Sequence, residues 1–310
     1  MHAARNSGWL LFSFLEIVMM FPGGLGQAAG DSPLIEAAKK GDVATVRALI
    51  AKRADVNETA RDGSTALLWA AYQSDLPMTQ ALIAAGAKPN TPNKYGITPL
   101  LQASRTGAAP IIQALLRAGG DLKVTHTEGE TALMAASYAG NVEAVRLLLE
   151  AGADINATDT YQKQTALMWA ATEGHTDVVK ALLDAKADPN VKAAVTSLTE
   201  RKHADHPTGG FTALMYAARN GHEDVVKALI AGGADPKLTN GDGATATIVA
   251  IVNDRLDLAK TLVDLGADAN DGSLYFAVDM HDATTDMRAK DGSRLRANFP
   301  NKLNALDLIK

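Results

Sequence analysis

The sequence predicts an all-α solenoid in which units of two short helices stack in a row. Three observations predict it. First, two apolar runs at helical spacing alternate with Gly-rich turns. Second, most units close with a loop in which Asn follows Asp or Lys two residues later. Third, equivalent threonines recur, mostly every 33 or 34 residues. Two such helices cannot bury their apolar faces alone, so copies have to cover one another. The threonines are Thr65, Thr98, Thr131, Thr165, Thr212 and Thr245.

The clearest unit runs from Gly210 to Asp235. Apolar residues at helical spacing occupy 213–218 and 225–230, with Asn220-Gly221 between the two runs. Gly232-Gly233 follows the second run. This order predicts a helix, a tight turn, a second helix and a closing loop.

Five units open with TALLWAA, TPLLQAS, TALMAAS, TALMWAA and TALMYAA, and several close with G-A-D. With the 33-residue period, these motifs resemble the ankyrin repeat from about residue 33 onward. The resemblance implies an ankyrin-repeat solenoid of stacked helix-turn-helix units with short β-hairpin fingers. One departure recurs, because the histidine of the family's T-P-L-H-x-A opening is absent. We expect packing to replace its role at Leu68, Leu101, Met134, Met168 and Met215.

Residues 30–310 are expected to form the repeat domain, with about seven repeats and an incomplete eighth. Ser32 and Pro33 suit the start of the first helix, and Pro77 and Pro110 fall where a first helical turn tolerates proline. Insertions near 191–209 and 279–301 interrupt the period, and the first is expected to extend a finger beside the groove at little entropic cost. The sequence stops before the equivalents of Leu229 and Ile230, which predicts a truncated reading frame or a frayed end.

Residues 1–29 are expected to form a signal peptide. Arg5 precedes an apolar stretch over 9–21, and small residues at 26–29 suit cleavage, although Glu16 interrupts the apolar stretch. The expected location is therefore periplasmic or secreted, with no membrane contact by the mature chain. A misassigned start and a retained anchor are the alternatives.

Composition excludes several classes of function. The net charge of −5 and a pI near 5.8 argue against general nucleic-acid binding. The chain has no cysteine, and it lacks a G-x-S-x-G, phosphate-loop or H-E-x-x-H motif. We expect no enzyme and no cofactor. His175 and His222, in the turns, are expected to pack and cap. His203, Asp205 and His206 could hold a metal, but a solvated loop is the stronger interpretation.

In the ankyrin family, ligands lie in the concave groove lined by the first helices and the fingers. The residues before and after the Ala-Ala pair of each unit are expected to point into it. Aromatic and arginine side chains there suit a protein interface, although the rings could instead pack on the neighbouring helix. The predicted partner-binding residues are Trp69, Tyr72, Gln102, Arg105, Tyr138, Trp169, Tyr216 and Arg219.

The resemblance implies a non-catalytic protein-protein interaction scaffold that binds a partner protein through the groove. We expect a monomer that acts in the bacterial envelope. Two alternatives remain open from the sequence. One is a secreted effector that engages a host protein, and the other is an accessory or metal-binding module of an envelope enzyme.

Overall fold

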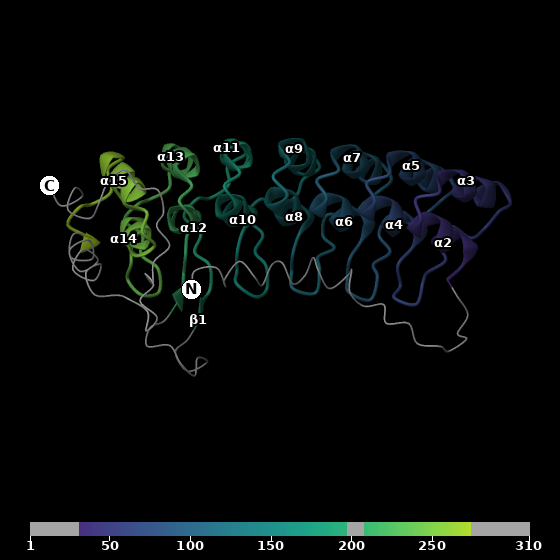
Figure 1. Ribbon diagram of the computed structural model, residues 1–310, viewed down its shortest axis with the longest axis horizontal. Helices are drawn as coiled ribbons and strands as arrows, with labels where there is room; N and C mark the ends of the chain where they lie inside the picture. Colours follow the sequence, from purple (N-terminus) through teal and green to yellow (C-terminus); the bar gives the residue numbers. More distant parts are fainter. Residues whose placement is uncertain (1–30, 197–207, 274–310) are drawn as a thin grey trace, which may run out of the picture.

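The computed structural model describes residues 31–196 and 208–273. Their helices lie in two parallel rows that curve together into an arc (Figure 1). The inner row carries the first helix of each repeat and the outer row the second. The inner helices are α2 (Pro33–Lys39), α4 (Ala66–Tyr72), α6 (Pro99–Arg105), α8 (Ala132–Tyr138), α10 (Ala166–Glu173), α12 (Ala213–Asn220) and α14 (Ala246–Val252). The outer helices are α3 (Val43–Ala51), α5 (Leu76–Ala84), α7 (Ala109–Arg117), α9 (Val142–Glu150), α11 (Thr176–Asp184), α13 (Glu223–Ala231) and α15 (Leu256–Asp264).

The repeated threonine begins each inner helix from α4 to α14. Its hydroxyl accepts a hydrogen bond from the backbone N–H three residues later, at 3.2 to 3.4 Å. This satisfies one of the N–H groups that a helix start leaves unpaired. The side chains that stand where the family has histidine are buried in the core, so packing does replace the imidazole, as the sequence predicted. Ser32 caps α2 in the same way, with Pro33 at the first helical position.

The turn between the two helices of a repeat needs a left-handed backbone, with φ of +83° at Gly221. Two repeats lack this glycine, and there Ser74 and Asp254 adopt φ of +55° and +59°. Residues with a Cβ rarely adopt this conformation. The repeat geometry therefore overrides the local preference at both positions, while Pro77 and Pro110 fit the first turns of α5 and α7.

Side chains from several turns also bond the turn of the preceding repeat. His175 Nε2 donates to the carbonyl of Tyr138 at 2.9 Å, and His222 Nε2 to that of Thr172 at 3.0 Å. Neither histidine caps its own helix with its side chain. The imidazoles instead cap the ends of the inner helices of the preceding repeats, because they bond carbonyls in the last turns of α8 and α10. A Cβ added to Gly140 would lie 2.6 Å from the His175 ring, so glycine is needed there.

Asparagines in the closing loops form a second ladder between repeats. Asn57, Asn90 and Asn190 each accept from a backbone N–H and donate to a backbone carbonyl of the next repeat, at 2.8 to 3.2 Å. The two ladders hold successive repeats in one register. They thereby fix the spacing of side chains along the inner row.

Fingers extend below the inner helices in Figure 1. The finger before α12 contains β1 (Val195–Thr196) and β2 (Thr208–Gly209), paired antiparallel with Val195 opposite Gly209. Residues 191–209 thus begin and end as a hairpin. The segment between the strands lies outside the described residues, as do the predicted leader, the 279–301 insertion and the incomplete eighth repeat.

Candidate protein-binding groove

Three positions of each repeat line the inner face of the stack, counted from the capping threonine. These are the residue just before the threonine, which ends the finger, and the fourth and seventh residues after it, on the inner helix. We call this inner face the groove. Because the repeats stack in register, each position forms a row that runs along the arc from α4 to α14 (Figure 1).

Aromatic side chains occupy the groove as edge-on or tilted pairs. Trp69 and Tyr72 lie with ring centroids 5.7 Å apart at 77°, within one repeat. Tyr138 and Trp169 meet across two repeats, at 5.9 Å and 78°. The indole N–H groups of Trp69 and Trp169 have no hydrogen-bond partner in the described part of the chain. Both nitrogens are themselves buried, where an indole N–H usually finds a partner.

A small hollow lies beside Trp69, at the N-terminal end of the groove. Its volume is about 50 Å³, far below the 300–1,000 Å³ of small-molecule pockets. A hollow of this size suits one side chain of a partner better than a free ligand. It is lined by Asp62, Ser64, Leu68, Trp69, Tyr72, Asn93, Tyr95, Ile97 and Gln102.

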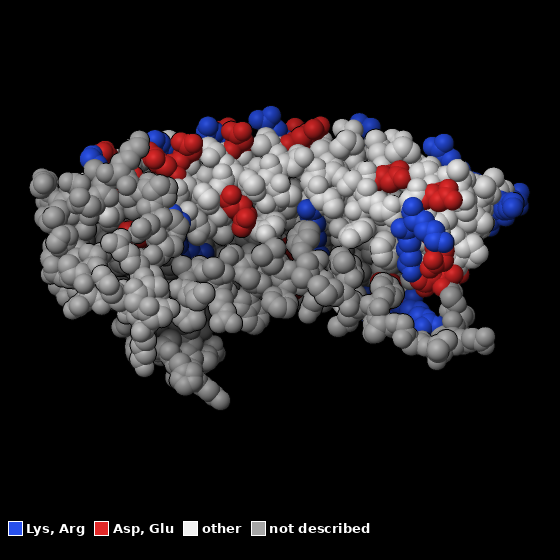
Figure 2. Space-filling view, in the orientation of Figure 1, with Lys and Arg blue, Asp and Glu red and all other residues white. Residues whose placement is uncertain are grey.

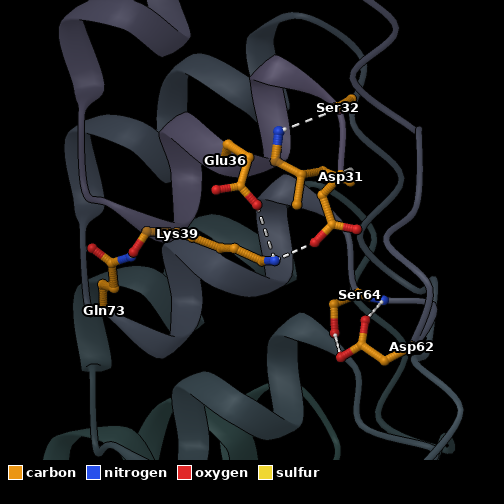
Figure 3. A network of polar contacts seen from close by, with 8 residues as sticks. Asp31, Ser32, Glu36, Lys39, Asp62, Ser64 and Gln73 are labelled. Carbon is orange, nitrogen blue, oxygen red and sulfur yellow. Dashed lines mark hydrogen bonds and ion pairs between the residues drawn. The ribbon is translucent and has the colours of Figure 1, made fainter. Parts of the chain in front are cut away.

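The ammonium group of Lys39, in the first repeat, lies over the face of the Trp69 ring. Lys39 Nζ lies 5.6 Å from the ring centroid and forms ion pairs with Asp31 and Glu36 (Figure 3). Burial lowers the pKa of Lys39, but the hydrogen bonds and charges of the two carboxylates outweigh it and leave the pKa raised. The first repeat thus holds Trp69 in place with a charged network. Figure 2 shows charges of both signs at this end of the stack, whereas much of the visible inner-row surface next to it is uncharged.

Arg105 on α6 is paired within the chain. Its Nε donates to Glu130 Oε1 at 3.1 Å and its terminal nitrogen pairs with Glu130 Oε2, with side chains 12% and 11% exposed. Glu130 precedes Thr131, so the pair joins the third and fourth repeats. Such a two-point contact uses the guanidinium fork fully. Arg105, which the sequence predicts to bind the partner, is therefore already paired with Glu130 within the chain.

Arg219 on α12 has the same register as Arg105 but different surroundings. Its guanidinium carbon lies 5.1 Å from the centroid of Tyr216 and 5.5 Å from that of Phe211. No described carboxylate pairs with it, and burial lowers the pKa of Arg219. Gln164 Nε2 donates to the Tyr216 hydroxyl at 2.7 Å, so the ring beneath the arginine is fixed from the neighbouring repeat.

The eight predicted residues differ in exposure. Tyr72 is 41% exposed, whereas Gln102 and Tyr216 are only 6% and 7% exposed and act mainly as walls. Trp69, Arg105, Tyr138, Trp169 and Arg219 are intermediate. Their roles in binding stay predictions. The sequence interpretation missed Glu130 and Phe211, because it did not follow the position before the threonine from one repeat to the next.

The described residues offer neither a metal site nor a membrane-spanning helix. Within 31–196 and 208–273, no group of three or more histidine or acidic residues could hold a metal. None of the helices there is both long enough and apolar enough to cross a bilayer. The candidate metal ligands His203, Asp205 and His206 lie outside these ranges.

Comparisons with known proteins agree with this architecture. The family model for ankyrin repeats matches residues 1–93, 73–159, 100–193 and 192–273. Solved structures in 566 chains match, so the likeness identifies an architecture shared by many proteins. One is the crystal structure of the human ASB11 ankyrin repeat domain, with 26% identity and a TM-score of 0.64 over 76% of this chain and 99% of that one. No curated protein sequence matches the chain.

Proposed function

This chain belongs to the ankyrin-repeat family, and from that premise we propose that it binds one partner protein through its groove, without catalysing a reaction. Proteins of this family are in general non-catalytic interaction modules, and they bind protein partners. The observation that carries the proposal is the row of partly exposed aromatic side chains along the inner face. These anchors extend over five repeats, from Trp69 to Arg219.

A groove of this length favours a protein over a small molecule. Its hollow beside Trp69 is too small for a typical ligand pocket. Aromatic and arginine side chains are enriched among the residues that dominate interface energies, because each buries a large area and keeps a polar group. The groove thus supplies separate anchors that one extended surface of a partner would contact together.

We propose in addition that the chain acts as an exported monomer in the bacterial envelope. This proposal is supported by the leader-like order of Arg5, the apolar stretch over 9–21 and the small residues after it. Cell fractionation with N-terminal sequencing tests it. Recovery from the periplasm with a start near residue 30 supports export, and recovery of the uncleaved chain from the cytoplasm contradicts it.

Partner capture tests the groove. The full chain is crosslinked in an envelope extract and compared with the variant Trp69→Ala, Tyr72→Ala, Trp169→Ala, in which the buried Tyr216 is kept to protect the fold. Arg146→Ala is the matched control, because Arg146 is exposed on the outer helix α9. We expect capture by the wild type and the control, and at least a tenfold loss, roughly, in the triple variant.

Circular dichroism must show the same helical content in all three proteins. If the folded triple variant still captures the partner at full strength, the groove is not the binding site. If Arg146→Ala loses capture instead, the outer row is the binding surface.

A further inference from the structure

The arginines at the seventh position after the threonine allow a comparison within one chain. Arg105 follows Thr98, and Arg219 follows Thr212, at the same distance. The carboxylate that pairs with Arg105 comes from Glu130, one residue before the threonine of the next repeat. The equivalent position for Arg219 is Ala244, just before Thr245. Among the described residues, the stack thus repeats the arginine position but places an acid before the following threonine only beside Arg105.

The residues around Arg219 fix its guanidinium in place without pairing it with an acid. The planar guanidinium lies against Phe211 and Tyr216, and Tyr216 is fixed by Gln164. No hydrogen bond from its guanidinium to a described residue is found, and burial is the main influence on its pKa, with only Tyr216 opposing it. A guanidinium stacked on the face of an aromatic ring keeps the N–H donors along its own edge available for hydrogen bonds.

We propose that Arg219 is the receptor for a single carboxylate, an aspartate or glutamate side chain of the partner protein, which takes the place that Glu130 takes at Arg105. This inference rests on the proposed function, because it names the chemistry that the partner places in the groove. A carboxylate fits better than a phosphate. One guanidinium neutralises one carboxylate, and within residues 31–196 and 208–273 no second lysine or arginine acts on the pKa of Arg219.

A variant that supplies the missing acid tests the proposal without removing the arginine. Ala244 is only partly buried, and Ala244→Glu recreates the arrangement of Arg105 and Glu130. Ala244→Gln is the control for size, because it adds a neutral side chain of the same length. Arg219→Gln removes the receptor itself.

The direct readout is the Nε–Hε signal of arginine side chains in the NMR spectrum of the full chain, with sodium acetate as the probe and sodium chloride at equal ionic strength as its control. We expect acetate to shift the Arg219 signal saturably. The Arg105 signal should not move, because Glu130 already occupies the hydrogen-bond donors of this guanidinium. In Ala244→Glu the Arg219 signal should no longer respond, whereas in Ala244→Gln it should. An Arg219 signal that ignores acetate in the wild type overturns the proposal.

The second readout is capture of the partner protein. Arg219→Gln and Ala244→Glu should each weaken capture about tenfold or more, and Ala244→Gln by much less. If the aromatic triple variant loses capture while Ala244→Glu keeps it, the groove binds the partner but Arg219 is not its carboxylate receptor. If acetate binds Arg219 while capture ignores both the aromatic and the arginine variants, the proposed function fails even though the receptor exists.

Discussion

The junction between the third and fourth repeats and the junction between the sixth and seventh repeats share one backbone plan and differ in one side chain. At the first junction, which we call the closed junction, Arg105 forms an ion pair with Glu130. At the second, which we call the open junction, Arg219 lies on two rings, and the position equivalent to Glu130 holds Ala244. A repeat protein can therefore assign the same position to stability in one unit and to recognition in another. The difference appears only when neighbouring repeats are compared.

The largest expected effect comes from breaking the closed junction. Glu130→Gln would leave the largely buried Arg105 charge without its acid, and removing one partner of a buried pair is strongly destabilising. We expect the free energy of unfolding to fall by about 2–3 kcal/mol, measured by urea denaturation. A loss below about 0.5 kcal/mol would mean that the pair behaves like an exposed ion pair.

Closing the open junction should give a smaller effect of the opposite sign. Ala244→Glu supplies Arg219 with an acid, so the free energy of unfolding should rise by about 1 kcal/mol. The gain should vanish in the Arg219→Gln background, which the double-mutant cycle measures. An equal gain in both backgrounds would show that the new glutamate acts elsewhere.

The smallest effect concerns His126, which lies beside the closed junction. Burial first, and the charge of Arg105 second, lower the pKa of His126 below its usual 6.5, against the opposing charges of Glu130 and Glu128. The unfolded chain therefore binds the proton more readily. Stability should be complete above pH 6.5 and should fall as the pH drops below it.

His126→Asn should flatten this fall, measured by thermal unfolding between pH 5 and 8 or thereabouts. The equivalent residues in other repeats are Asn93 and Asn240, whose side chains accept from the finger backbone at 2.8 to 3.0 Å. The substitution therefore restores a contact that the fold already uses. An unchanged pH profile would show that another group titrates.

Much of the fold could be predicted from local chemistry. The threonine that opens each repeat caps a helix, and prolines fit first turns, because both effects act within a few residues. The imidazoles of His175 and His222 were placed in the correct turns, but their bonds cross to another repeat. Contacts between repeats depend on register, which the sequence shows only when equivalent positions are aligned.

The groove was harder to predict for the same reason. Tyr216 was expected in the groove, yet it is buried between Phe211, Gln164 and Arg219. Side-chain exposure depends on the size of neighbours in the adjacent repeat. Glu130 lies 25 residues from Arg105 and outside the motif that marks the repeat. Following the position before each threonine would have shown an acid in one repeat and alanine in another.

Hydrogen-deuterium exchange of the full chain, with and without its captured partner, tests the central claim most directly. The account predicts slower exchange on binding in the inner helices α4, α6, α8, α10 and α12 and in the fingers beside them, and no change in the outer helices. Slower exchange confined to the outer row, from α5 to α13, would contradict it.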